Sequence, residues 1–111
     1  MVAKEWVPDA GDVNWIDLDP TVGREQAGKR PALVLSPSSY NRKTSLLIAC
    51  AMTTEKKGYP FEVEMPDGGI VLADQVRCLD WRFRNARAKD TAPLEVLKQV
   101  RILLGTLFQI Q

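Results

Sequence analysis

The sequence predicts a mainly β protein, a small antiparallel barrel that ends in one α-helix. Short apolar runs recur between turn signals along residues 12–87, as they do in barrels built from short strands. Residues 61–65 alternate apolar and polar side chains, which is typical of a half-exposed strand. From residue 93 onward, apolar residues recur at steps of three and four, the period of a helix.

The first half of the chain contains three predicted strands and a long loop. Residues 12–19 mix β-favouring and acidic side chains and end at Pro20, so they form the first strand. Residues 21–30 hold two glycines and few apolar side chains, which predicts a loop of a length that is often functional in a compact domain. Residues 31–36 and residues 45–52 are predicted to form two buried strands, and residues 38–44 between them are predicted to form a helical turn.

The second half begins with a predicted hairpin. Residues 61–65 and 70–73 read as strands, and Pro66-Asp67-Gly68-Gly69 between them is a turn signal. Residues 75–87 continue as one or two further strands.

The C-terminal segment is predicted to be a helix over Pro93–Phe108. Thr91 is a plausible N-cap, and Pro93 suits the first turn. Because the helix is broadly apolar, we expect it to pack against the sheet or across a dimer.

Length and composition exclude several classes of protein. With 111 residues, the chain is expected to form one domain over residues 1–111. The apolar runs are too short to span a bilayer, and Met1–Trp6 lacks the apolar stretch of a signal peptide, so a cytoplasmic location is expected. There is no histidine, the commonest general base and zinc ligand. Cys50 and Cys78 are too few for a disulfide framework and are interpreted as reduced packing residues.

Charge is distributed unevenly although the net charge is only +1. Up to Pro20 there is one lysine against five acidic residues, whereas residues 77–89 hold five bases and a single acid, Asp80. A local basic stripe of this kind can bind phosphates even when the whole molecule is nearly neutral. The five bases are Arg77, Arg82, Arg84, Arg87 and Lys89.

The most informative motif is the polar loop Gly23–Pro31, which leads into the apolar run Ala32–Ser36 and places Glu25 and Arg30 five residues apart. Further motifs follow in order: Tyr40–Thr44, Thr53-Thr54, Lys57–Val63, Leu72–Arg77 and Trp81-Arg82. Together they resemble the MazF/PemK family of toxins, the RNA-cleaving halves of type II toxin–antitoxin systems. The resemblance extends over nearly the whole chain.

The resemblance implies an SH3-like barrel of the CcdB/MazF type with a C-terminal helix, assembled as a homodimer. It also implies a sequence-specific endoribonuclease that cuts single-stranded RNA, including mRNA, without a metal or cofactor. The products would carry a 2′,3′-cyclic phosphate and a 5′-hydroxyl, cleavage would inhibit translation and growth, and a cognate antitoxin would neutralise the toxin. We expect that antitoxin to lay an acidic, flexible segment over the basic stripe.

The family's catalytic positions fall on Glu25, Arg30 and Thr53. Glu25 is the candidate base for the ribose 2′-hydroxyl, a task that suits a carboxylate only when it is buried. Arg30 would clamp the charge that develops on the phosphoryl oxygens, and Thr53 would donate a hydrogen bond to the same phosphate. Which group protonates the leaving oxygen stays open.

Other residues are candidate substrate contacts. Some PemK-type relatives rely on an Asp and an Arg two residues apart on a later strand; here Asp74 is present, but Leu72 occupies the Arg position. Asp74 is therefore a runner-up base or substrate contact. The remaining candidates for RNA contact are Gln75, Arg77, Arg82, Arg84 and Asn41.

Several of these residues could instead have purely structural roles. The arginines could form a solvated strand face, although Arg82 and Arg84 would share one side of a strand and could track a backbone together. The large aromatic residues are interpreted as core or dimer contacts rather than base-stacking platforms; they are Trp6, Trp15, Trp81 and Phe61.

Two rival functions remain open at this point. A gyrase poison of the CcdB type shares the fold, but the ending Phe108-Gln109-Ile110-Gln111 lacks the Trp-Gly-Ile that resembles the gyrase-binding tail. A catalytically inactive RNA-binding domain would bind the same RNA and leave it intact. The sequence gives neither the RNA motif that is cut nor the identity of the antitoxin.

Overall fold

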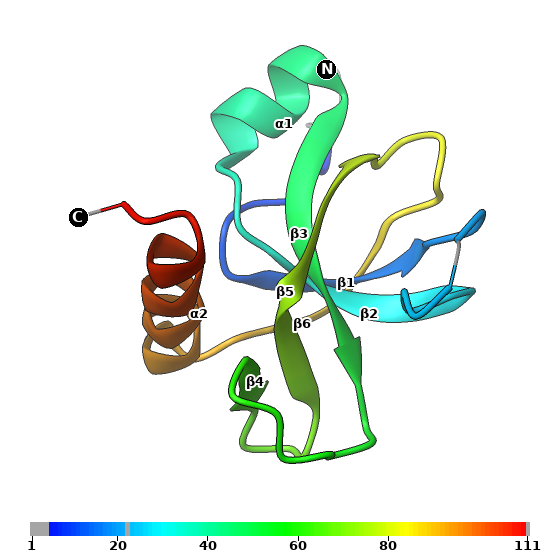
Figure 1. The fold of residues 1–111 in the computed structure, drawn as a ribbon. Coiled ribbons are helices and arrows are strands. Elements are labelled where there is room, and N and C mark those ends of the chain that lie inside the picture. Colours follow the sequence, from blue (N-terminus) through cyan, green and yellow to red (C-terminus); the bar gives the residue numbers. More distant parts are fainter. Residues whose placement is uncertain (1–4, 22, 111) are drawn as a thin grey trace.

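The structure is a computed structural model that describes residues 5–21 and 23–110. Most of the N-terminal segment Met1–Trp6 and Val22 of the predicted loop thus lie outside the described residues. The described residues form six strands and two helices, with α1 between the second and third strands and α2 after the last (Figure 1). They are β1 (Asp12–Asp17), β2 (Lys29–Val34), α1 (Ser38–Thr44), β3 (Leu46–Thr53), β4 (Glu62–Glu64), β5 (Ile70–Asp80), β6 (Arg87–Thr91) and α2 (Leu94–Leu107).

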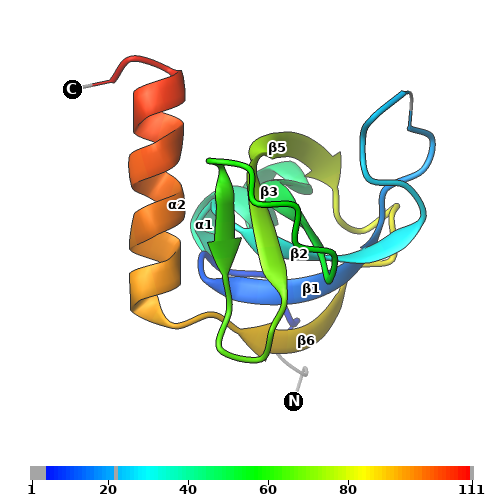
Figure 2. The ribbon, with the colours of Figure 1, turned by 60° about the horizontal axis from the view of Figure 1, so that its bottom comes forward.

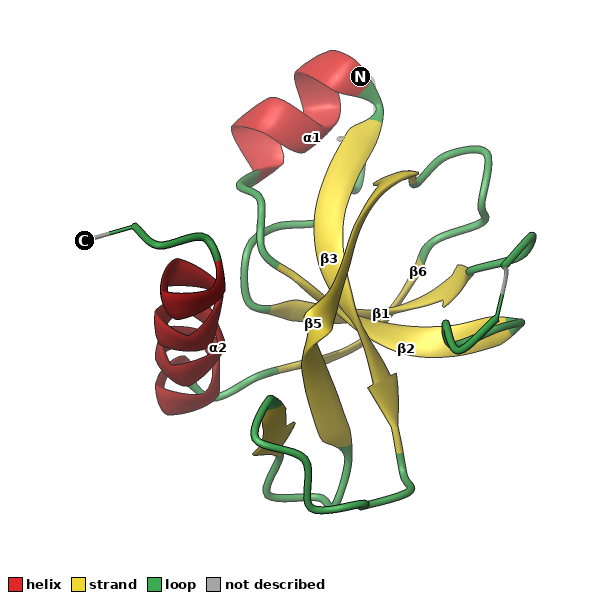
Figure 3. Cartoon of the chain, in the orientation of Figure 1, coloured by secondary structure: helices red, strands yellow, loops and turns green. Residues whose placement is uncertain are grey.

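The strands form one twisted antiparallel sheet in the order β4-β5-β3-β2-β1-β6 (Figure 3). The predicted class, mainly β with a C-terminal helix, is therefore confirmed. Among the described residues, β4 and β6 are the two edges of the sheet, so hydrogen bonding does not close it into a complete barrel.

Some element boundaries differ from the prediction. The first strand ends at Asp17 and the second begins at Lys29, so the connecting loop runs from residue 18 to residue 28. Residues 75–87 belong to two strands, the second of the predicted alternatives: residues 70–73 and 75–80 lie in the single strand β5, and a turn over residues 81–85 leads into β6. The turn predicted at residues 66–69 does join β4 to β5.

The N-cap of α2 is Pro93 rather than Thr91, and it makes no side-chain capping bond. Thr91 instead pairs with Asp12 as the last residue of β6. The N-cap prediction is wrong because a long-range strand pairing, invisible in the local sequence, takes Thr91.

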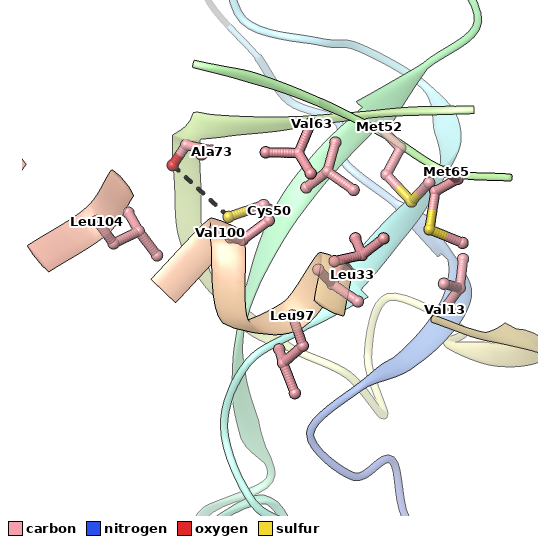
Figure 4. Packing of buried hydrophobic residues seen from close by; sticks show 12 residues of the cluster. Val13, Leu33, Cys50, Met52, Val63, Met65, Ala73, Leu97, Val100 and Leu104 are labelled. Atoms are coloured by element: carbon pink, nitrogen blue, oxygen red, sulfur yellow. Dashed lines mark hydrogen bonds between the residues drawn. The ribbon is translucent and has the colours of Figure 1, made fainter. Parts of the chain in front are cut away.

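One part of the core lies between α2 and the sheet (Figures 2 and 4). The helix buries Val96, Leu97, Val100 and Leu104 against apolar residues of the strands. Cys50 lies in this cluster, where its thiol contacts the Ala73 carbonyl oxygen at 3.7 Å and burial raises its pKa to about 12. Cys78 is also a free thiol but is exposed, so the interpretation as a packing residue holds for Cys50 and fails for Cys78.

The opposite face of the sheet carries a second cluster, which includes Ile16, Leu18, Leu47 and Trp81. The Trp81 indole N–H donates to the Asn41 carbonyl oxygen at 2.8 Å, and its ring meets that of Trp6 edge-on at a centroid separation of 6.0 Å. This cluster fixes the end of β5 and the turn after it.

Asn14 is a polar residue buried inside the protein. Its side chain is 1% exposed, and among the described residues neither its amide nitrogen nor its amide oxygen has a hydrogen-bond partner. An unpaired buried amide costs roughly 1–3 kcal/mol. We expect Asn14→Val to raise the free energy of unfolding by about 1–2 kcal/mol in urea titrations, because the apolar side chain removes that cost and favours a strand.

Asn41 supplies the matched control. It is equally buried, but its amide donates to the carbonyl oxygens of Pro8 and Ser36 and accepts from the Ser36 hydroxyl. Asn41→Leu should therefore destabilise the protein. A loss of stability in Asn14→Val similar to that in Asn41→Leu would contradict the account of Asn14.

The outer side of α2 leaves apolar side chains exposed, with Leu94 at 58%, Ile102 at 68% and Phe108 at 58%. Within the described part of the chain, neither helix has the length and apolar character needed to cross a membrane.

Candidate functional site

Two cavities meet at the C-terminal end of β3, and Thr53 lines both of them. We call the first, of about 530 Å³, the Arg30 pocket; its lining includes Lys29, Arg30, Thr53, Trp15, Met65 and Lys89. We call the second, of about 610 Å³, the Asp74 pocket; its lining includes Asp74, Gln75, Thr53, Arg24, Gln26 and Tyr59. An extended ligand lying across Thr53 would therefore have one pocket on each side of that residue.

The Arg30 pocket has an apolar floor and charged side chains, three of them basic and two, Asp67 and Asp90, acidic. Val13 and Trp15 of β1, with Met52 of β3, contribute to the floor. Lys29 and Arg30 enter from the start of β2, and Lys89 enters from β6 with its ammonium nitrogen 5.5 Å from the centre of the Trp15 ring. Cations over an aromatic and apolar floor suit a ligand that has both phosphates and flat rings.

Arg30 and Thr53 are the two predicted catalytic residues that the structure brings into one pocket. The Arg30 Nε donates to the Ala27 carbonyl oxygen at 3.1 Å, which ties the guanidinium to the loop before β2. The Thr53 hydroxyl oxygen accepts from the Glu55 N–H at 3.1 Å, and a hydroxyl in that role can still donate its own proton. Both side chains are thus placed to donate to an anion in the pocket.

Glu25 lies in the loop over residues 18–28 and is exposed. The expectation of a buried base is therefore wrong for this structure. Its neighbours Arg24 and Gln26 line the Asp74 pocket, so the loop brings Glu25 to the edge of the same region as Thr53.

The Asp74 pocket is mainly polar. Asp74 is exposed on β5 and lines it together with Gln75, whose side-chain oxygen accepts from the Gln26 N–H at 2.9 Å. Glu62 also lines it and accepts from the N–H groups of Lys57 and Gly58. Carboxylate and amide groups in a hollow suit the hydrogen-bonding edge of a base.

The predicted basic stripe is not one surface. Arg77 donates to the Leu18 carbonyl oxygen at 2.8 Å, and Arg84 donates to those of Asp17 and Asp19 at 3.0 and 2.7 Å. Arg82 instead pairs with Glu5 at 2.9 Å and lies over the Trp81 ring. The argument that Arg82 and Arg84 share a strand face is wrong, because both lie in the turn after β5.

Asn41 lines neither of the two pockets. Its side chain is 0% exposed and bonded to Pro8 and Ser36, so the prediction that it contacts RNA is wrong. The core interpretation is confirmed for Trp81, which is buried, and Phe61 packs partly against the core. Trp15 departs from it, because it is 37% exposed and lines the Arg30 pocket.

Sequence reasoning missed several lining residues, namely Lys29, Met65, Arg24, Gln26 and Tyr59, and it placed Lys89 in the basic stripe but not in this pocket. Lys29 and Arg24 stand next to predicted catalytic residues, and that adjacency was an available signal. Lys89 reaches the site only because β6 pairs with β1, a contact between residues more than 70 positions apart that no local pattern announces.

Comparisons with known proteins show the family to which the chain belongs. Residues 9–108 match the family model of the PemK-like, MazF-like toxins of type II toxin–antitoxin systems. The endoribonuclease toxin MazF of Escherichia coli K12 is 47% identical over 110 residues, which cover 96% of this chain and 98% of that protein.

Solved structures of MazF proteins also superpose on this chain. MazF from Deinococcus radiodurans superposes with a TM-score of 0.92 at 50% identity, covering 96% of this chain and all of that one. A MazE–MazF structure from the same organism superposes with a TM-score of 0.87 at 50% identity and the same coverage. The chain belongs to the family of PemK-like, MazF-like toxins of type II toxin–antitoxin systems.

Proposed function

We propose that residues 1–111 act as one toxin domain, an endoribonuclease that cuts single-stranded RNA at a short sequence and so inhibits translation and growth. The observation that carries the proposal is the meeting of Arg30 and Thr53 in one pocket, with the second pocket on the other side of Thr53. The similarity to endoribonucleases named MazF supports it over nearly the whole chain.

The chemistry that we propose is an internal transesterification without a metal or cofactor. The ribose 2′-oxygen attacks the phosphorus, the bond from phosphorus to the 5′-oxygen breaks, and the 5′-oxygen leaves as a hydroxyl after taking a proton. Glu25 accepts the proton of the 2′-hydroxyl. Arg30 and Thr53 donate hydrogen bonds to the phosphoryl oxygens as their charge grows. The products are a 2′,3′-cyclic phosphate and a 5′-hydroxyl.

Exposure of Glu25 is compatible with this role only if bound RNA covers the loop. A nucleotide that fills the Asp74 pocket would lie against Arg24 and Gln26, the neighbours of Glu25. Substrate would then exclude water from the carboxylate and make it a stronger base. In the same account, Asp74 and Gln75 hydrogen-bond the base in that pocket, and a second base lies over Trp15.

A cognate antitoxin is the proposed protein partner, and it brings an acidic, flexible segment over the Arg30 pocket. Three cations, Lys29, Arg30 and Lys89, outnumber the two acids, Asp67 and Asp90, in the lining of that pocket, so an acidic peptide would compete there with RNA phosphates. We also propose a homodimer, which would cover the apolar residues exposed on the outer side of α2, and a cytoplasmic location, where mRNA is translated.

Antitoxin binding should depend strongly on salt. Because the proposed contacts pair carboxylates with exposed cations, we expect the dissociation constant to rise at least about tenfold between 50 and 300 mM salt. Calorimetric titration of the toxin with the antitoxin's acidic segment measures it, and Lys29→Ala/Lys89→Ala should flatten the dependence. A dissociation constant unchanged across that range would contradict the acidic-segment model.

The test of the function is digestion of a long, mostly single-stranded RNA in excess EDTA with antitoxin-free protein. We expect cuts at one short motif, mapped by primer extension, with cyclic phosphate on the upstream fragment. RNA that is bound but stays intact would identify the inactive RNA-binding domain. Intact, unbound RNA together with capture of gyrase would identify the CcdB-type poison.

A further inference from the structure

We propose that Arg77 and Arg84 are positioning residues that hold the Glu25 loop, defined here as the described residues 18–21 and 23–28, in the place that catalysis requires. The inference rests on the proposed function of Glu25. It replaces the expectation that these two arginines bind RNA phosphates.

The described part of the loop is largely polar and solvent-accessible. Leu18 at its start is buried, but residues 23–27 are exposed or half-buried, and Gly23 and Gly28 adopt positive φ angles of 64° and 77°. Glycines and polar side chains leave many backbone conformations accessible, so ordering such a loop costs entropy. Bonds from outside the loop, in addition to those within it, compensate for that cost.

Two guanidinium groups bind the last residue of β1, Asp17, and the first two residues of the loop, Leu18 and Asp19. Arg84 Nη1 donates to the carbonyl oxygens of Asp17 and Asp19, and Arg77 Nη1 donates to that of Leu18 between them. The Arg84 carbonyl oxygen also accepts from the Asp17 N–H at 3.1 Å. Three consecutive carbonyl oxygens are thus bound by charged donors, which form stronger hydrogen bonds than neutral ones.

The C-terminal part of the loop is hydrogen-bonded to its N-terminal part and to β5. The Gly28 N–H donates to the Asp19 carboxylate at 3.0 Å, and the Leu18 N–H donates to the Gly28 carbonyl oxygen at 2.9 Å. The Gln26 N–H, next to Glu25, donates to the Gln75 side-chain oxygen. Both ribbon views place the loop beside the turn after β5 that carries Arg84 (Figures 1 and 2).

These contacts connect the arginines to the chemistry. Arg30 bonds to Ala27 of the same loop, so displacement of the loop would move Glu25 and the Arg30 guanidinium together. A misplacement of about 1 Å can cost on the order of 100-fold in rate without loss of substrate affinity. A phosphate-binding arginine would behave in the opposite way, since its removal weakens binding and lowers the salt dependence of binding.

The experiment compares Arg84→Ala and Arg77→Ala with Arg42→Ala, which removes an exposed guanidinium from α1. We measure kcat and KM on a short RNA at several salt concentrations, and the rate at which trypsin cuts after Arg24. We expect kcat to fall about 10–100-fold in both loop variants, with KM within about threefold and its salt dependence unchanged. Trypsin should cut after Arg24 at least about tenfold faster, and Arg42→Ala should match wild type throughout.

A raised KM with a weaker salt dependence, normal kcat and normal trypsin cutting would overturn the proposal and restore the phosphate-binding interpretation. If Arg84→Ala does not fold, Arg84→Lys gives the same test with a smaller effect. Trypsin cutting does not depend on nuclease activity. A wild-type protein that leaves RNA intact would therefore refute the proposed function while the loop is still tested.

Discussion

Arg30→Ala should lower kcat for RNA cleavage by about 1000-fold, the largest effect that we expect from a single substitution. Arg30 of β2 and Thr53 of β3 are the two predicted catalytic donors in the pocket, and loss of one preorganised donor to a developing oxyanion costs about 100–1000-fold. Arg30 also bonds to the Glu25 loop through Ala27, so its removal affects two catalytic groups at once. Single-turnover cleavage of a short RNA in excess EDTA measures the effect.

Arg30→Lys tests whether the positive charge of Arg30 alone is sufficient for catalysis. Lysine keeps the charge but lacks the planar fork that can hold Ala27 and a phosphate simultaneously. We expect it to recover no more than about tenfold of the lost rate, whereas a role limited to attracting RNA would recover nearly all of it. Arg30 is exposed, so both variants should keep wild-type stability within about 0.5 kcal/mol in urea. Near-normal cleavage by Arg30→Ala would remove Arg30 from the mechanism.

Glu25→Gln should lower kcat by about 100–1000-fold and leave KM within about threefold. Glutamine keeps the size and one acceptor oxygen of the side chain but cannot take up a proton, so it removes general base catalysis alone. Gel shift with an RNA that carries a 2′-deoxy nucleotide at the cut, which cannot react, measures binding separately.

Glu95→Gln on the exposed first turn of α2 is the matched control, because it removes a carboxylate away from either pocket. It should cleave like wild type. If Glu25→Gln also cleaves like wild type, the base is another group, and Asp74 becomes the first candidate because it lines the pocket next to Thr53.

The sequence predicted those parts of the fold that local patterns determine. The helical period over Leu94–Leu107 and the turn residues between β4 and β5 both gave the right elements. Local patterns could not show that Thr91 pairs with Asp12, or that Trp81 and Asn41 are joined by a hydrogen bond. These contacts depend on the tertiary arrangement of the chain.

The site was predictable to a similar extent. The motif around Glu25 and Arg30 drew attention to the correct loop and to the start of β2. The sequence could not reveal what each arginine faces, because charge alone does not distinguish a phosphate-binding side chain from one that bonds to backbone carbonyl oxygens. Arg77 and Arg84 were therefore assigned to RNA, whereas the structure shows both bonded to the loop.

The most direct test of the central claim is cleavage, in excess EDTA, of a DNA oligonucleotide that carries one ribonucleotide at the mapped cut. The account predicts one cut, on the 3′ side of the ribonucleotide, with a 2′,3′-cyclic phosphate and a 5′-hydroxyl at the new ends. The same oligonucleotide made entirely of DNA should stay intact. Cleavage of both oligonucleotides alike, or of neither, would contradict a 2′-hydroxyl attack assisted by Glu25, Arg30 and Thr53.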